Sequence, residues 1–458
     1  MEDTKIKNKE TSTWNKEIKI PFMDILNRMY PFLSFWAAFF CIGIFIISPF
    51  IVGILCLFHH SVDYTIFAHP LIIDYFIWPL SAVAGLTAIV TYLIKRKASV
   101  NNLFSWLKNN PVCLYFFCHA IWMFISTCVN GWNQYCLFGD SNHLRFETIF
   151  MQFGYFVILF SSSLLINDKN KKIFLIRLHE AVSFFLSIAA FILWKTQINS
   201  LFYQWKPGVT AIFSNINYYG YYLSVSIPLS AAMFVEEKKD IWRIFSVAAI
   251  TTNTIALAYN NTMGGWVACT AAIIFMIIAH IIVEHKPNRQ VMYAASVYFL
   301  CLIIFGYLSG NLVKNFSSLF SDMFNIAAQA PSSDRAGSGR WLIWKRCLKL
   351  ISESPLFGIG FEGVCVRELL EFAKNSRPHN EYLQYTLFYG IPSGIAYLAG
   401  CISVYFRALH NRANLNSMTL VCLVAAFGYL VSAFFGLTLF ATTPYLFIFL
   451  GMGYETRS

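Results

Sequence analysis

Long apolar runs recur along the chain from residue 31 to residue 454. Most hold about 18 to 25 residues, enough for a helix to cross the roughly 30 Å of bilayer hydrocarbon. The pattern predicts an all-α, polytopic transmembrane protein of about twelve spans. The predicted spans are 31–57, 71–94, 111–130, 147–166, 174–195, 215–235, 241–259, 263–284, 291–309, 383–406, 416–436 and 438–454.

The charges between these runs predict how the chain is oriented. Residues 1–30 are polar and lysine-rich, and no small-residue cleavage site follows the first run, which favours a cytoplasmic tail over a signal peptide. With the tail inside, both termini are cytoplasmic and every inner loop is basic, whereas the short outer loops nearly lack Lys and Arg. The inner basic residues are Lys95, Arg96, Lys97, Lys108, Lys169, Lys171, Lys172, Lys238, Lys239, Arg243, Lys286, Arg289, Arg407, Arg412 and Arg457.

One predicted outer loop, residues 310–382, is long and rich in charge, and it separates spans 1–9 (31–309) from spans 10–12 (383–454). Long loops escape the charge rule, and loops of this length usually carry function or folded elements. Helical spacing of apolar residues predicts an amphipathic, interfacial helix over 339–352 and a second short helix over 362–374.

Composition narrows the function classes. Hydrophobic residues make up 57% and charged residues 12%, whereas soluble chains carry about 25% charged residues. The net charge of +11 lies in the loops, where it sets orientation, so no nucleic-acid partner is expected. The 12 cysteines form no C-x-x-C pair and lie mostly in apolar runs, so no metal site is predicted. Cys347 and Cys365, both in the long loop, either pair or stay free.

Candidate chemistry gathers in the same loop. Arg340 begins the first predicted loop helix, and His379 and Asn380 stand where the chain returns to the bilayer. Arginine suits phosphate oxygens, and a neutral histidine can take a proton from a hydroxyl, so the two favour a metal-free reaction on a lipid phosphate. The alternatives are that Arg340 only anchors a helix to anionic headgroups and that His379 only begins a helix. Gly358 and Gly360 either cradle phosphate or form a turn.

A transporter or flippase is the rival from another class, and a scaffold for envelope assembly is a third interpretation. A transporter should carry buried charges along its spans, and the candidates here are few. They are Asp74, His119, His179 and Glu180. We interpret His119 as a hydrogen-bonded packing residue.

Three motifs in the loop resemble a known family. They are Gly339-Arg-Trp-Leu-Ile-Trp344, Pro355-Leu-Phe-Gly-Ile-Gly360, and His379-Asn-Glu-Tyr-Leu383 with Gly390 further on. In this order they resemble the bacterial O-antigen ligase and polymerase superfamily, whose signature is similar to R-x-x-x-W, P-x-x-G-x-G and H-N-x-x-L. A weaker likeness to the family's F-x-N-P-N covers 213–217, where Ile216 replaces proline, and Met263 stands where arginine is frequent.

The resemblance implies transfer of a glycan from an undecaprenyl-diphosphate-linked oligosaccharide to a glycan acceptor, outside the bacterial cytoplasmic (inner) membrane, with inversion and without metal or cofactor. Arg340 would bind the diphosphate, His379 would deprotonate the acceptor and Asn380 would orient it or the glycan. Further substrate contacts are expected from Lys206, Asn215, Asn217, Arg335 and Arg377. Lys206 stands in for the family's arginine, without its bidentate fork. Asn215 and Asn217 alternatively cap the next span.

The resemblance leaves two closely related reactions. The polymerase, which joins lipid-linked repeat units of an O-antigen, capsule or exopolysaccharide, is the first choice, and the alternative is a ligase that moves finished glycan to a lipid core or other surface acceptor. Both use the same donor and differ in the acceptor. Membrane lipids and a chain-length regulator are the other partners implied.

Overall fold

The computed structural model describes most of the chain in several stretches. They are Arg28, Phe32 and residues 39–43, 45–51, 108–133, 136–137, 147–166, 168–196, 209–213, 215–285, 288–363 and 377–454. Over these stretches the protein is α-helical and holds no strand, which confirms the all-α class. The predicted span 71–94, Lys206, Asp74, Cys365 and most of the predicted tail lie outside the described residues.

Most described helices follow the predicted spans within a few residues, because an apolar run in lipid must close its own backbone hydrogen bonds as a helix. Among the helices of the described stretches, five are long and apolar enough to cross a membrane: α6, α9, α11, α12 and α13. The total of twelve spans stays a prediction. The bounds are α6 Pro111–Asn130, α8 Ile149–Leu165, α9 Lys169–Lys195, α10 Ile216–Glu236, α11 Asp240–Asn260, α12 Met263–Glu284, α13 Arg289–Leu308, α19 Ser417–Ala433 and α20 Thr443–Gly453.

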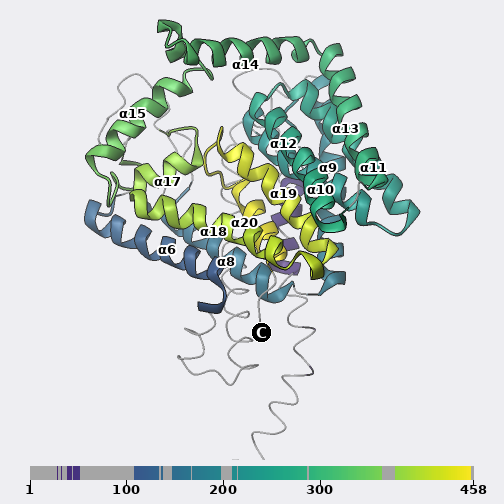
Figure 1. Ribbon diagram of the computed structural model, residues 1–458, viewed down its shortest axis with the longest axis horizontal. Coiled ribbons are helices and arrows are strands. Elements are labelled where there is room, and N and C mark those ends of the chain that lie inside the picture. Colours follow the sequence, from purple (N-terminus) through teal and green to yellow (C-terminus); the bar gives the residue numbers. More distant parts are fainter. Residues whose placement is uncertain are drawn as a thin grey trace, which may run out of the picture.

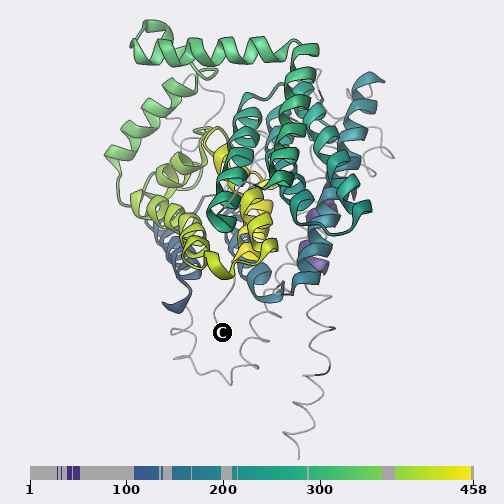
Figure 2. The same cartoon turned by 45° about the vertical axis from the view of Figure 1, so that its right-hand side comes forward.

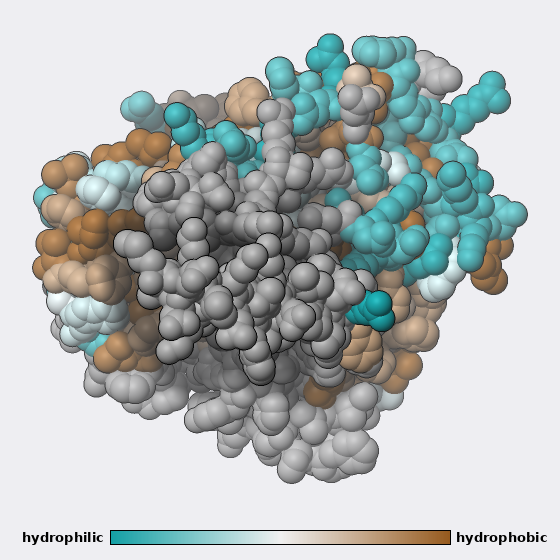
Figure 3. All heavy atoms as spheres, turned by 90° about the horizontal axis from the view of Figure 1, so that it is seen from below, coloured by the Kyte–Doolittle hydropathy of each residue, from teal (hydrophilic) through white to brown (hydrophobic). Residues whose placement is uncertain are grey.

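The helices pack as a bundle around α10, α19 and α20 (Figure 1). α10 lies against α11, α12 and α19, while α20 packs on α8 and α19. Large apolar side chains on the outer faces of α12 and α13 stay exposed, among them Ile274, Ile278, Leu300 and Ile303. Seen from the end opposite α14, hydrophobic residues line one flank and hydrophilic ones gather along the upper and right edges (Figure 3). This is the surface of a membrane protein, which offers apolar flanks to lipid.

The predicted span 383–406 is not one helix, which corrects the sequence expectation. The chain forms α17 (Glu381–Tyr389) and α18 (Ile391–His410), separated at Gly390. Gly390 has φ +89°, a conformation that glycine adopts without strain, and Pro392 opens the next helix. The amide of Ile391 donates to the carbonyl of Pro355 at 2.8 Å, so the break docks the loop onto the bundle.

Three loop elements cross one end of the bundle. They are α14 (Asn311–Ala327), the 3₁₀ turn η4 (Pro331–Arg335) and α15 (Arg340–Glu353). α14 runs across the ends of the upright helices, and α15 descends from it towards α17 (Figures 1 and 2). The predicted helix over 339–352 is confirmed as α15, whereas α14 was not predicted. The second predicted loop helix falls mostly on residues 364–376, which lie outside the described part.

Candidate functional site

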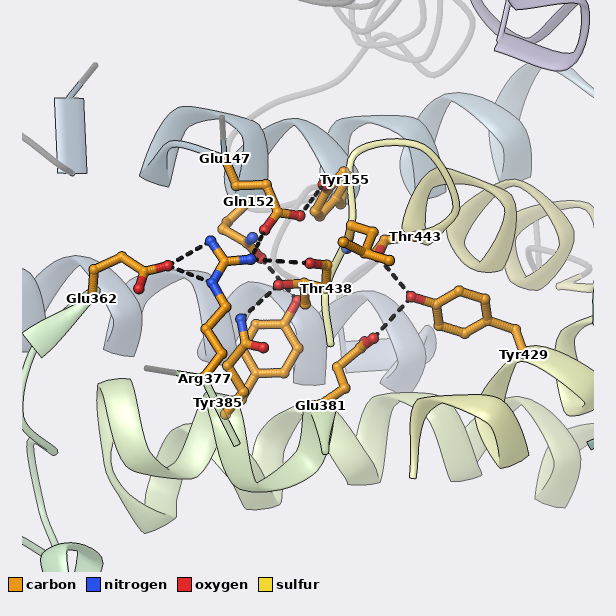
Figure 4. Close-up of polar contacts among 12 residues, drawn as sticks. Glu147, Gln152, Tyr155, Glu362, Arg377, Glu381, Tyr385, Tyr429, Thr438 and Thr443 are labelled. Atoms are coloured by element: carbon orange, nitrogen blue, oxygen red, sulfur yellow. Dashed lines mark hydrogen bonds and ion pairs between the residues drawn. The ribbon is translucent and has the colours of Figure 1, made fainter. Parts of the chain in front are cut away.

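Arg377 is buried at the centre of an ion-pair cluster that joins three distant segments (Figure 4). Its Nη1 lies 2.5 Å from Oε2 of Glu147, just before α8, and its Nη2 lies 2.5 Å from Oε1 of Glu362. Nη1 also donates to the carbonyl of Thr438, between α19 and α20, at 3.4 Å. These contacts fix the start of the 377–380 turn to the bundle.

The cluster gives Arg377 a structural role. Burial by itself would lower the pKa of Arg377, but the carboxylates of Glu362 and Glu147 outweigh it and raise that pKa above its ordinary value. A guanidinium shared by two carboxylates has little charge left for a diphosphate. These contacts favour a positioning role for Arg377, and the substrate contact expected from the sequence stays a prediction.

The backbone on either side of His379 is anchored. The indole Nε1 of Trp344, on α15, donates to the carbonyl of Pro378 at 2.9 Å. Oδ1 of Asn380 accepts from the amide of Leu383 at 3.0 Å and so caps α17. His379 itself has φ +51°, in the left-handed region that residues other than glycine rarely adopt. Such a conformation persists only where neighbouring contacts impose it, and it is common at functional sites.

The His379 imidazole is half-buried, and its ring nitrogens form no hydrogen bond with any residue that the structure describes. Burial, followed by the positive charges of Arg340 and Arg377, lowers the pKa of His379 to about 4. The ring is therefore neutral near pH 7. One ring nitrogen carries a free lone pair, which is the form that a general base needs.

Arg340 is the first residue of α15 and follows Gly339, whose φ is +86°. It is half-buried, it makes no ion pair within the described stretches, and its charge reaches His379. The positive end of the α15 dipole adds to this charge. The guanidinium is therefore available to an anion.

The other predicted substrate residues are placed differently. Arg335 ends η4 and is exposed. Asn215 caps α10, since its Oδ1 accepts from the amide of Asn217 at 2.8 Å, so the capping alternative holds for Asn215. Asn380 is 3% exposed, and its amide nitrogen makes no hydrogen bond to the described residues. The substrate roles of these residues stay predictions.

The glycine motif at 355–360 packs backbone against backbone. The amides of Ile359 and Gly360 donate to the carbonyls of Leu387 and Phe388, at 2.9 and 3.0 Å. A Cβ on Gly358 would lie 2.5 Å from the carbonyl oxygen of Leu387. Because these amides are already used, the structure favours the turn over a phosphate cradle.

Sequence reasoning missed the residues that hold the site in place. Glu147 and Glu362 were not singled out, because no sequence pattern links either acid to Arg377. The role of Trp344 was also missed, though it lies in the first motif. His119 packs as expected, with Nδ1 2.9 Å from the Ser393 carbonyl oxygen. In the described part of the chain no three His, Cys, Asp or Glu side chains gather as a metal site would require.

The helical bundle carries a neutral histidine and an arginine without an ion-pair partner in the described stretches. These two groups are typical of an enzyme site, and the bundle is typical of a membrane protein. Residues 245–398 match the family model described as O-antigen ligase. This match bears out the likeness to the O-antigen ligase and polymerase superfamily that the motifs show, and it supports a function of that general type. It runs from α11 into α18 and so includes Arg340 and His379. No curated protein matches the chain.

Replacing Arg377 should unfold the site. In Arg377→Met, Glu147 and Glu362 lose their cation while remaining buried, which is expected to cost about 3–5 kcal/mol of stability. Thermal unfolding in detergent measures the effect as a lower melting temperature. Arg335→Met is the matched control, because an exposed side chain without such partners should change stability by about 0.5 kcal/mol or less. Equal melting temperatures for the two variants would refute the role given to Arg377.

Proposed function

We propose that the protein is a membrane glycosyltransferase that polymerises lipid-linked oligosaccharide repeats, with undecaprenyl diphosphate as the carrier. The observation that supports this most is the pairing of a neutral, unbonded His379 with an available Arg340 in an anchored turn. Phosphate recognition and proton abstraction are the two tasks that such a transfer needs.

The reaction is a single displacement at the anomeric carbon of the donor glycan. The acceptor hydroxyl loses its proton to a ring nitrogen of His379 and its oxygen forms the new glycosidic bond. The bond between the anomeric carbon and the diphosphate oxygen breaks, and the electron pair leaves with the diphosphate. Arg340 offsets the charge that grows on this leaving group, and one displacement inverts the anomeric centre. The donor needs no metal in this scheme.

The proposed site lies on the outer side of the cytoplasmic membrane. α14 lies across one end of the bundle, and α15 descends from it towards α17, the helix that the His379 turn precedes (Figure 1). These segments belong to the predicted outer loop. The turns at the other end include Lys238, Lys239 and Arg412, which the charge rule assigns to the inside.

A ligase is the second candidate, and the description of the matching family model favours it. Arg340 and His379 would serve either reaction, because the two reactions differ only in the acceptor.

Product size tests the proposal. The purified protein in lipid nanodiscs is given undecaprenyl-diphosphate-linked repeat units alone, and the products are separated by electrophoresis. A ladder of lengths is the expected result. Single transfer that requires an added lipid-core acceptor would instead establish the ligase, and no transfer with any acceptor would overturn both.

A further inference from the structure

α14 has three distinct faces, which its sequence of apolar and polar residues sets up at helical spacing. One face packs on the protein through Leu312, Asn315 and Leu319. A second face carries exposed polar residues: Lys314, Ser317, Ser318 and Ser321. The third is a stripe of exposed apolar side chains, Val313, Phe316, Phe320 and Phe324, which are 66%, 53%, 65% and 74% exposed.

The apolar stripe follows in the chain directly after a helix whose last turns are also apolar and exposed. Directly before α14, the outer face of α13 exposes Ile303, Ile304, Tyr307 and Leu308. α14 then turns across the helix ends (Figures 1 and 2), as a helix lying along a bilayer surface would. The apolar flank of α13 is expected to face lipid. The stripe on α14, which follows α13 in the chain, is therefore also expected to contact lipid.

The packed side of α14 is tied to the site. A carboxylate oxygen of Asp322 accepts from the amide of Gly337 at 2.9 Å, three residues before Arg340. Oδ1 of Asn325 accepts from the hydroxyl of Ser332 at 3.1 Å. At the other end, Nδ2 of Asn311 donates to the carbonyl of Ala258 at 2.9 Å, which fixes the start of α14 to α11.

We propose that α14 is a membrane-docking helix whose Phe316–Phe320–Phe324 stripe inserts among the acyl chains of the bilayer phospholipids. Docking holds the Gly337–Arg340 turn at the depth of the lipid headgroups, where a lipid-linked diphosphate lies. The docking itself needs only the membrane. Its effect on Arg340 rests on the proposed function.

Two protein partners are the rival occupants of the stripe. A second copy of this chain or a chain-length regulator would cover the same phenylalanines. We favour lipid because α14 follows directly after α13, a helix long and apolar enough to cross a membrane, and because its stripe is flanked by a polar face. This is the arrangement of a helix that lies in the membrane interface.

Photo-crosslinking tests the docking without any need for activity. The full chain is prepared in nanodiscs with p-benzoylphenylalanine in place of Phe320 and, as the matched control, in place of Ser318 on the polar face. Illumination should give phospholipid adducts for the first protein and at most traces for the second, detected by mass spectrometry. Adducts to a second protein chain, or equal lipid adducts at both positions, would overturn the proposal.

Activity then tests the link to Arg340. Phe316→Ser with Phe320→Ser should raise the KM for lipid-linked donor about tenfold. The reason is that the turn that carries Arg340 is then no longer held at the depth of the lipid headgroups. The control, Ser317→Ala with Ser318→Ala, should leave KM unchanged. Lipid adducts with an unchanged KM in the phenylalanine variant would remove the link while keeping the docking. An inactive parent protein that still forms the adducts would count against the proposed function alone.

Discussion

Replacing His379 by alanine is expected to lower kcat by about 10²- to 10⁴-fold, because the acceptor hydroxyl then has no base at the reacting carbon. The parent and variant are compared in nanodiscs with the same lipid-linked donor, by counting sugar units transferred with time. Binding of the donor, measured separately, should persist, since Arg340 remains. His379→Gln keeps a similar volume and hydrogen bonding without basicity, so it should be as inactive as His379→Ala. Transfer at the parent rate in either variant would exclude His379 as the base.

The pH profile gives the same assignment a second readout. The pKa of His379 is lowered to about 4 by burial and by Arg340 and Arg377, so the neutral base is present above that pH. The acid limb of kcat/KM, which reports the free enzyme, should therefore lie near 4 and well below the ordinary value for histidine. Bound diphosphate cancels part of the charge of Arg340, so the limb of kcat should lie higher. An acid limb that His379→Gln does not remove would belong to another group.

Replacing Arg340 by glutamine is expected to lower kcat/KM by about 10²- to 10³-fold, the usual loss when a group that stabilises developing charge is removed. Arg340→Lys should recover only part of this, because lysine keeps the charge without the planar fork. Arg340→Gln should also move the acid limb of kcat/KM upward from about 4, since one positive neighbour of His379 is gone. Steady-state kinetics over pH and donor concentration measure both effects.

Lys349→Gln is the control for the alternative that Arg340 only anchors α15 to anionic headgroups. Lys349 is exposed on the same helix and is equally able to anchor α15 to anionic headgroups. If anchoring were the role of Arg340, the two substitutions would have similar small effects on kcat/KM, and neither would move the pH limb.

The spans could be predicted because the membrane imposes a local rule. Every backbone group in lipid must be satisfied within its own helix, so an apolar run marks the helix and its polar neighbours mark the ends. The prediction for α6 and α12 agrees with the structure at both ends. The break at Gly390 was missed because a long apolar run conceals it. Gly390 and Pro392 permit the break, and the hydrogen bond from Ile391 to the carbonyl of Pro355 holds it against the loop.

The candidate site also has one part that the sequence predicts and one part that it does not. Arg340 and His379 could be singled out from motif chemistry, and α15 and the 377–380 turn do adjoin through Trp344. The state of Arg377 could not be foreseen, because Glu147 lies 230 residues away in the chain. α14 was missed because its phenylalanines alternate with serine and asparagine, so that no continuous apolar run marks it.

The buried cluster around Arg377 limits how this site can be transplanted. The matched domain ends at residue 398 and begins at residue 245, so it holds Arg377 and Glu362 but neither Glu147 nor Thr438. A chimaera that grafts only this stretch onto another helical scaffold would bring a buried guanidinium without half of its counter-charge. A graft taken from this chain therefore needs the segment before α8 as well as the loop.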